Sequence, residues 1–188
     1  MSASHSAVIS AIGRGFDGLD VPALAKDLGA ELIRLEDFDA TVAAVLAEAP
    51  AAENIVAQGT GDIAFDAEVA AALGLPLAII SGAPQRTGEL AQHNAESLGA
   101  TVAGIFTDLE AVPGALAALG DVSPVMSADL FQKQLIDQAR AAGSHIVLPE
   151  GDDDRILEAA HVVLRDKVAK LTILGNEADI KARAEELK

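Results

Sequence analysis

Two glycine-rich loops are the first candidates for chemistry, because each follows a short apolar run that predicts a β-strand. The first, Gly13-Arg14-Gly15-Phe16-Asp17-Gly18, precedes a predicted helix and has Glu36 and Asp37 about twenty residues later, as a dinucleotide-binding fingerprint does. However, Asp20 and Pro22 place the helix start after the last glycine, and aspartates would lie beside the pyrophosphate. A plain glycine-rich loop is the favoured interpretation, with dinucleotide binding as the alternative.

The second loop, Gly59-Thr60-Gly61-Asp62-Ile63-Ala64, has a similar glycine spacing. The strand predicted after it ends in Ser81-Gly82 without the acid that a ribose would need. We therefore expect a turn in which Asp62 caps the next helix. The sequence contains no G-x-x-x-x-G-K-[ST] motif, so it has no P-loop for gripping phosphates.

An acidic segment, Glu150-Gly151-Asp152-Asp153-Asp154, lies where a predicted strand gives way to a helix. Ligands of open α/β sheets bind at that end of the strands, and carboxylates there could hold Mg²⁺ through water. Acids are also stabilised at a helix N-terminus by the helix dipole, and Arg155 beside them is the expected neutralising partner. Capping, with the helix starting after Asp152, is favoured over cation binding, and the carboxylates oppose a bare phosphate.

The remaining residue types offer little catalytic machinery. There is no Cys and no G-x-S-x-G nucleophile elbow, and the histidines lack the spacing of a metal site. The only basic spot in the acidic N-terminal stretch, residues 84–88, is interpreted as a turn leading into a helix. The sequence thus predicts no metal site and no catalytic residue. The four histidines are His5, His93, His145 and His161.

The elements around these loops predict an α/β fold with a mostly parallel sheet flanked by helices. Seven runs rich in Val, Ile and Leu show little polar alternation, as strands covered on both faces do. Amphipathic segments lie between them, with start signals at Asp20, Asp152 and Asn176. Leu-Gly pairs ending in Gly29, Gly74, Gly99 and Gly120 predict helix ends. The predicted strands are Ala7–Ile12, Glu31–Leu35, Asn54–Gln58, Pro76–Ser81, Thr101–Phe106, His145–Leu148 and Leu171–Leu174.

Two domains are predicted, residues 1–120 and 121–188, because the charge balance changes between them. Residues 1–120 hold four basic and sixteen acidic residues, and residues 121–188 hold nine and thirteen. The second part should open with a helix over about 127–142 that buries Leu130, Phe131, Leu135, Ile136 and Ala139 on one stripe. Two βα units follow, and they cannot cover both faces of a sheet. The second part is therefore expected to be the opening of a larger domain.

Composition excludes several function classes. The 188 residues are 51% hydrophobic, enough for a real core, and carry a formal net charge of −16. So acidic a surface repels nucleic acid and anionic lipid. The apolar runs are too short to span a bilayer, the first residues do not resemble a signal peptide, and the lack of Cys fits a reducing compartment.

From Pro124 onward the sequence resembles the start of the acetyltransferase domain of phosphate acetyltransferases. The matching pieces are Phe131–Arg140, His145–Ala160 and Leu171–Ile180. The string L-P-E-G-D-x-D-R-I-L-x-A-A followed by L-x-I-L-G-N is the specific part. The preceding stretch is similar to the dethiobiotin-synthetase-like N-terminal domain of long-form members, through residues 54–61, 65–74 and 77–81. It lacks the Walker-type loop, so a regulatory or assembly role is expected.

The resemblance implies a segment of an enzyme that interconverts acetyl-CoA and phosphate with acetyl phosphate and CoA in acetate metabolism. It implies a soluble, cytoplasmic protein with an isocitrate-dehydrogenase-like catalytic domain, these small-molecule substrates, and neither a metal nor a prosthetic group. The family's catalytic residues lie downstream of everything matched, so none is assigned here and this chain alone should be inactive. A homo-oligomer stays an option. The alternatives are a non-enzymatic regulatory or interaction module and a small nucleotide-binding domain using Gly13–Gly18.

Overall fold

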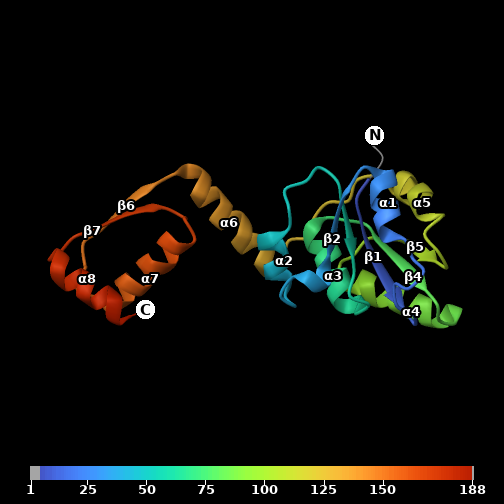
Figure 1. Cartoon of the computed structure of the whole chain (residues 1–188), viewed down its shortest axis with the longest axis horizontal. Helices are drawn as coiled ribbons and strands as arrows, with labels where there is room; N and C mark the ends of the chain where they lie inside the picture. The colour runs from blue at the N-terminus through green and yellow to red at the C-terminus, as the bar shows by residue number, and fades with distance from the viewer. Residues whose placement is uncertain (1–4, 188) are drawn as a thin grey trace. The chain divides into compact units, whose positions relative to one another are not determined.

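The chain forms two units, which divide between Leu130 and Phe131 in a computed structural model that describes residues 5–187 (Figure 1). Helix α6 (Ala128–Ala142) begins in the first unit and ends in the second. The first unit otherwise contains β1 (Ala7–Ile12), α1 (Val21–Leu28), β2 (Glu31–Arg34), the 3-10 helix η1 (Leu35–Asp37), α2 (Val42–Glu48), β3 (Ile55–Gln58), α3 (Ile63–Leu73), β4 (Leu77–Ser81), α4 (Gln85–Ser97), β5 (Val102–Phe106) and α5 (Val112–Leu119). The second unit adds β6 (His145–Leu148), α7 (Asp154–Arg165), β7 (Lys170–Ile173) and α8 (Glu177–Glu186).

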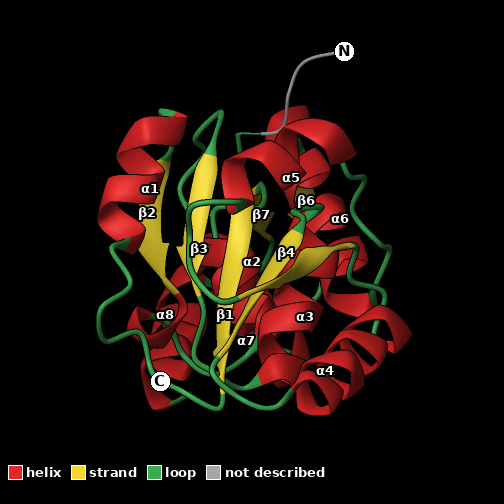
Figure 2. Cartoon of the chain, turned by 90° about the vertical axis from the view of Figure 1, so that its right-hand side faces the viewer, coloured by secondary structure: helices red, strands yellow, loops and turns green. Residues whose placement is uncertain are grey.

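The first unit is built on a five-stranded parallel sheet in the order β2-β3-β1-β4-β5 (Figure 2). Its central strand β1 is buried along its whole length and pairs with β3 on one side and β4 on the other, so that Val8 lies opposite both Ala57 and Leu77. Parallel strands need crossover helices, and those helices cover both faces of the sheet. The predicted α/β fold with a mostly parallel sheet is confirmed.

Two apolar cores lie on opposite faces of this sheet. On one face, Val8, Leu77 and Ile79 pack with side chains of α2, α3 and α4, such as Val45 and Ala91. On the other, Ala7, Ile9, Ala78 and Ile80 contact α1 and α5, including Val21 and Leu116. Alternate residues of each strand therefore pack against helices on opposite faces of the sheet. Because both faces are buried, the strands are continuous apolar runs in the sequence.

Most predicted helix boundaries are confirmed, with two corrections. Asp20 and Asn176 cap α1 and α8 as expected, but α7 is capped by Asp153 rather than Asp152, because the chain makes one more turn residue before the helix. Gly29 and Gly74 end their helices in the left-handed conformation. Gly120 also ends its helix, α5, but it does not adopt the left-handed conformation. Its ψ of −161° leads the chain into an extended segment.

That extended segment is docked on the first unit. The amide of Val125 donates a 2.8 Å hydrogen bond to the carbonyl of Ala71, and Pro124 lies against Gly74. Leu130, in the first turn of α6, is buried with Leu46 of α2 and residues of α3. The compact first unit thus includes residues 121–130. The charge balance changes ten residues earlier and does not mark this boundary, because the docking of the segment depends on apolar contacts.

The second unit is small and open. It holds a two-stranded parallel sheet, β6-β7, with Leu157 and Ala160 of α7 buried. The expected buried stripe of α6 is wrong: Leu130 is buried, but Phe131 and Leu135 are 59% and 56% exposed. Two strands offer too little surface to cover that stripe. Whether this unit has an isocitrate-dehydrogenase-like architecture stays a prediction.

Candidate functional site

The carboxyl ends of the first unit's strands meet at one edge of its sheet, because all five strands are parallel. The two glycine-rich loops follow β1 and β3 and therefore both lie at this edge, beside the loops that follow β4 and β5. Ligands of such sheets bind outside the carboxyl ends of the strands, so a ligand of the first unit would be expected at this edge.

A buried carboxylate, Asp66, lies beneath the second glycine-rich loop. Its side chain is fully buried in the first turn of α3 and accepts a 2.6 Å hydrogen bond from Ser10 Oγ of β1. It also accepts from the backbone amide and the hydroxyl of Thr60, at 2.8 and 2.9 Å, and from the amide of Gly61 at 3.3 Å. Burial raises the pKa of Asp66, while these hydrogen bonds oppose that shift.

The loop is shaped around this carboxylate. A Cβ added at Gly59 would lie 2.3 Å from Asp66 Oδ2 and 2.9 Å from the carbonyl oxygen of Ile9, so only glycine fits there. Because all four hydrogen bonds to Asp66 come from the protein, its oxygens fix the loop and do not point to a ligand. Sequence reasoning missed Asp66, since an acid in a helix's first turn reads as a surface residue favoured by the dipole.

Asp62 takes the capping role expected of it. Its carboxylate accepts hydrogen bonds from the amides of Ala64 and Phe65, at 2.9 and 3.2 Å. The loop Gly59–Ala64 is thus a capped turn held from below by Asp66, which favours the structural interpretation over nucleotide binding.

Arg14 ties the first glycine-rich loop together and links it to the end of β5. Its guanidinium donates to the carbonyls of Gly15, Asp17 and Thr107, at 3.3, 2.9 and 3.4 Å. Helix α1 begins only after Gly18, with Asp20 as its cap, so the third glycine stays outside the helix. This geometry agrees with a plain loop and departs from the dinucleotide fingerprint. Residues 84–88, predicted to be a turn leading into a helix, are instead the start of the helix itself, because Pro84 is the N-cap of α4 and residues 85–88 form its first turn.

The acidic segment lies at the carboxyl end of β6, where the second unit has a cavity of about 630 Å³. Gly151 closes its floor: the amide donates to the carbonyl of Leu174, and an added Cβ would lie 2.6 Å from Ile180 Cδ1. The charged residues among its lining are mostly acidic: Asp152, Asp154, Asp179 and Glu186, with one basic residue, Arg183. A cavity so charged disfavours phosphate and other anions.

Two of the acidic side chains form ion pairs with arginines. Asp153 caps α7 and pairs with Arg155 at 2.5 Å, and hydrogen bonding from Arg155 lowers the pKa of Asp153. Asp154 accepts both Nε and Nη2 of Arg183, at 2.7 and 2.6 Å, which joins α7 to α8 and lowers the pKa of Asp154. Glu150 and Asp152 are exposed. Capping with an arginine partner is therefore confirmed, although the capping residue is Asp153.

The histidines lie apart from one another. His5 Nδ1 is 3.0 Å from the carbonyl oxygen of Leu28, and His145 Nε2 is 2.8 Å from Thr172 Oγ1. No group of three or more metal-ligating side chains gathers anywhere in residues 5–187. Within the same residues, no helix is long and apolar enough to cross a bilayer.

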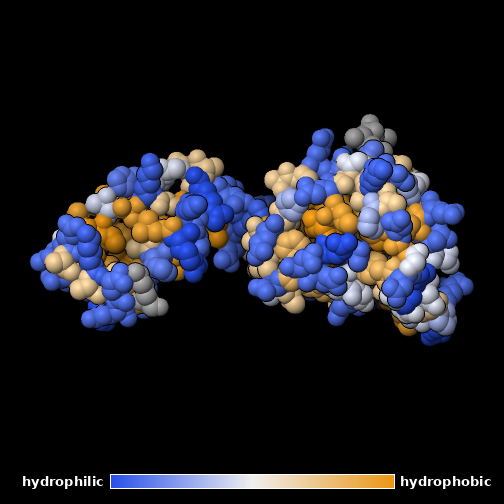
Figure 3. All heavy atoms as spheres, in the orientation of Figure 1, coloured by the Kyte–Doolittle hydropathy of each residue, from blue (hydrophilic) through white to orange (hydrophobic). Residues whose placement is uncertain are grey.

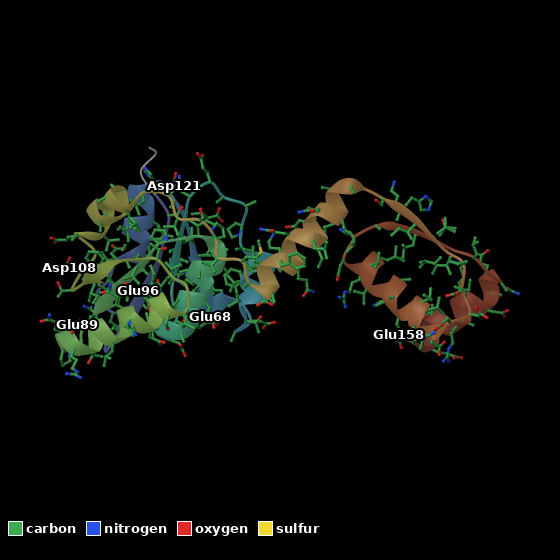
Figure 4. The ribbon with its side chains drawn as sticks, turned by 180° about the vertical axis from the view of Figure 1, so that it is seen from behind. Glu68, Glu89, Glu96, Asp108, Asp121 and Glu158 are labelled. Carbon is green, nitrogen blue, oxygen red and sulfur yellow. The ribbon has the colours of Figure 1, made fainter. Side chains whose placement is uncertain are left out.

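Exposed acids are spread over several helices. Glu68 of α3, Glu89 and Glu96 of α4, and Glu158 of α7 all lie on the surface (Figure 4). These side chains do not gather at the loops that follow the strands of either unit. The negative charge of the molecule is thus distributed over its outer faces.

Comparison with known proteins finds relatives of the C-terminal segment. Residues 130–188 match a family described as phosphate acetyl/butaryl transferase. A phosphate acetyltransferase of Corynebacterium glutamicum is 60% identical over 62 residues, which cover 33% of this chain and 19% of that relative. One from Escherichia coli is 42% identical over 65 residues, 35% of this chain and 9% of the relative. One from Acetivibrio thermocellus is 39% identical over 54 residues, 29% of this chain and 16% of the relative.

The resemblance of the C-terminal segment to phosphate acetyltransferases is confirmed. The chain spans less than a fifth of the length of these relatives. No solved structure matches it significantly. The resemblance of the N-terminal stretch to dethiobiotin-synthetase-like domains stays a prediction.

Proposed function

We propose that this chain is a segment of a phosphate acetyltransferase, whose complete protein interconverts acetyl-CoA and phosphate with acetyl phosphate and CoA. The observation that carries the proposal is the 60% identity with the Corynebacterium relative over 62 residues. The family match spans the whole of β6, α7, β7 and the loop around Gly151, which are consecutive parts of one folding unit.

The chemistry indicates that residues outside this chain would complete the active site. Transfer of an acetyl group to phosphate requires a base for the CoA thiol, donors for the tetrahedral oxyanion, and cations for the phosphate. In the second unit, as far as it is described, each arginine is paired with a carboxylate of the same unit. None of these cations is free for phosphate, which supports the proposal that the chain alone is inactive. These arginines are Arg140, Arg155, Arg165 and Arg183.

The proposal includes a cytoplasmic protein that uses acetyl-CoA and phosphate as substrates and needs neither a metal nor a prosthetic group. We assign the first unit a regulatory or assembly role. The docking of Pro124, Val125 and Leu130 onto it supports this role, because the first unit holds the start of the helix that leads into the transferase segment.

A chimera tests the proposed function. Residues 1–188 are fused to the part of the Corynebacterium relative that follows its matched stretch, and acetyl-CoA formation from acetyl phosphate and CoA is measured. The chimera should be active, whereas the 188-residue chain alone should show no turnover above background. An inactive but folded chimera, or an active chain of 188 residues, would contradict the proposal.

A further inference from the structure

The two edges of the five-stranded sheet in the first unit differ in charge. Strands β2 and β5 lie at its edges, and each has one side without a pairing neighbour among the described residues. Strand β2 carries the exposed charges of Glu31 and Arg34, and such charges protect an edge against pairing with another chain. Strand β5, with the sequence VAGIF, carries no charge, and Ile105 is 36% exposed. Of these two edges, that of β5 is therefore open to pairing.

The uncharged surface continues from β5 onto the helix that follows it. Helix α5, with the sequence VPGALAAL, packs on one face of β5 through Val112 and Leu116, and its last residue, Leu119, is 40% exposed. Figure 3 shows apolar atoms at the surface of the first unit among hydrophilic ones. In a chain with a formal net charge of −16, a contact between two copies needs such a strip, because it keeps like charges apart.

The hydrogen bonds between β4 and β5 determine which backbone groups of β5 face the open edge. The amide of Leu77 donates a 2.9 Å hydrogen bond to the carbonyl of Thr101, so Leu77 directs its own backbone groups to β5. Ile79 does the same, because these groups alternate in direction along a strand. In a parallel pair, one member of each opposed pair of residues bonds to the neighbouring strand and the other points away. Val102 and Ile105, opposite Leu77 and Ile79, therefore direct their groups to the open edge.

Helix α4 covers the other face of β5, and the order of its exposed charges is complementary to that of a second α4 running in the opposite direction. Arg86 and Glu96 lie at equal distances in sequence on either side of Ala91, and so do Glu89 and His93. Figure 4 shows Glu89 and Glu96 along this helix. Two antiparallel copies of α4 centred on Ala91 would therefore bring Arg86 of each copy close to Glu96 of the other, and Glu89 close to His93.

We propose that two copies of this chain associate through the open edge of β5, pairing their β5 strands in antiparallel fashion so that the two sheets become one. This inference rests on the assembly role proposed for the first unit. A two-fold axis perpendicular to the sheet relates the copies, as closed dimers require, and makes the paired strands antiparallel. The same axis places both α4 helices on one face, running in opposite directions, and both uncharged α5 helices on the other.

The antiparallel arrangement also separates the acids at the ends of the strands. Asp108 and Glu110 follow the carboxyl end of β5, whereas the residues at its start, 99–101, are uncharged. Because the strands run in opposite directions, the acidic end of each β5 lies beside the uncharged start of the other. An extended peptide of another protein would also use the edge, but it would not require the symmetric order of charges on α4. That order favours a second copy as the occupant.

Self-association of the 188-residue chain tests the proposal. Sedimentation from micromolar to millimolar concentration should show an equilibrium between monomer and dimer, and amide hydrogen exchange is followed over the same range. The amides of Val102 and Ile105 should exchange about tenfold more slowly in the dimer, because they become hydrogen-bonded. The amide of Phe106 faces β4 and is the internal control, so its exchange should change little.

Charge-swap variants locate the contact. Glu96→Arg would bring two arginines together at each end of the α4 pair, and should raise the dissociation constant of the dimer about tenfold. This variant lowers the net negative charge, which by itself would strengthen association, so the two effects have opposite signs. Adding Arg86→Glu restores opposite charges and the original net charge, and should return the dissociation constant close to its original value. Both positions are exposed, so the fold is preserved.

Leu135→Lys is the matched control for another exposed apolar surface, that of α6, and should leave the dimer intact. A chain that stays monomeric at millimolar concentration, a dimer abolished by Leu135→Lys, a dimer without protection of Ile105, or failure of Arg86→Glu to rescue Glu96→Arg would each overturn the proposal. Association is measured without substrates. A monomeric chain would therefore leave the assignment to a phosphate acetyltransferase standing, and an inactive chimera would contradict that assignment but not the dimer.

Discussion

At the scale of single residues, Asp66 decides the shape of the sheet edge in the first unit. It is the one charged side chain that is fully buried among the described residues, and it joins β1, the loop after β3 and α3 through four hydrogen bonds. A buried carboxylate is costly unless its oxygens are satisfied, and here every donor belongs to the protein. The loop resembles a nucleotide-binding turn because it wraps around this acid.

Replacing Asp66 by alanine should destabilise the first unit by about 2–4 kcal/mol. The loss arises because the buried hydroxyl of Ser10 would be left without an acceptor, and the amides of Thr60 and Gly61 would lose their hydrogen bonds to the carboxylate. Urea unfolding followed by circular dichroism measures it. Glu68→Ala, an exposed position on the same helix, is the matched control and should change the free energy of unfolding little. Equal effects of the two substitutions would show that the hydrogen bonds contribute nothing.

The same carboxyl predicts a pH dependence. Burial raises its pKa in the folded state above the ordinary value of 3.8, so the folded chain binds this proton more tightly than the unfolded chain. Its contribution to stability therefore falls as pH rises from about 4 through the raised pKa. The stability advantage of the natural chain over Asp66→Asn should shrink between pH 4 and pH 7 in urea titrations. A constant difference across that range would contradict the assignment.

At the scale of elements, glycines that share a conformation differ in what surrounds them. Gly29 and Gly74 both end helices with φ near the left-handed value, at 63° and 68°. A Cβ at Gly29 would meet nothing within 4 Å, whereas one at Gly74 would lie 2.6 Å from Pro124 Cδ. The contact at Gly74 is therefore where the segment before α6 is seated.

Alanine substitutions separate these two contributions. Gly29→Ala should cost about 1–2 kcal/mol from left-handed strain. Gly74→Ala should cost about 1–3 kcal/mol more, because the methyl group must displace Pro124. Thermal unfolding of the two variants under identical conditions gives the difference. If both lose the same stability, Pro124 does not pack on Gly74 in solution.

The strands and their order of appearance could be predicted from sequence, because buried parallel strands leave continuous apolar runs such as Ala7–Ile12. The helix caps at Asp20 and Asp62 could also be predicted, because a capping side chain bonds to backbone amides only a few residues away in sequence. The role of Asp66 was not, because its burial depends on the tertiary contact with Ser10 of β1, which lies 56 residues away in sequence. The predicted burial of the apolar stripe of α6 was wrong. An apolar pattern shows that a helix face favours burial, but it does not show whether the protein has a surface that covers this face.

At the scale of the whole molecule, the two units differ in how much apolar surface they bury. The first has a five-stranded sheet with helices on both faces, while the second has two strands and exposes Phe131, Leu135, Ile146 and Val147. Unfolding free energy scales with the apolar surface that is buried. The second unit should therefore open at lower free energy than the first.

Urea titration of the full chain, read by amide hydrogen exchange, should resolve two transitions. The amides of β6 and β7 should exchange through the less stable one, and those of β1 and β4 through the more stable one. A chain of residues 1–130 should retain the second transition alone, because it keeps both cores and Leu130. A single transition shared by all strands would mean that the units fold as one.

The position of β1 has a consequence for biosynthesis. It is the first described strand to leave the ribosome, yet its two neighbours begin at Ile55 and Leu77. Its apolar residues must therefore wait without a pairing partner until β3 ends at Gln58, about 46 residues after Ile12, which takes a few seconds at elongation rates of about 5–20 residues per second. Nascent chains of this protein are candidates for binding by chaperones that shield apolar segments during that interval.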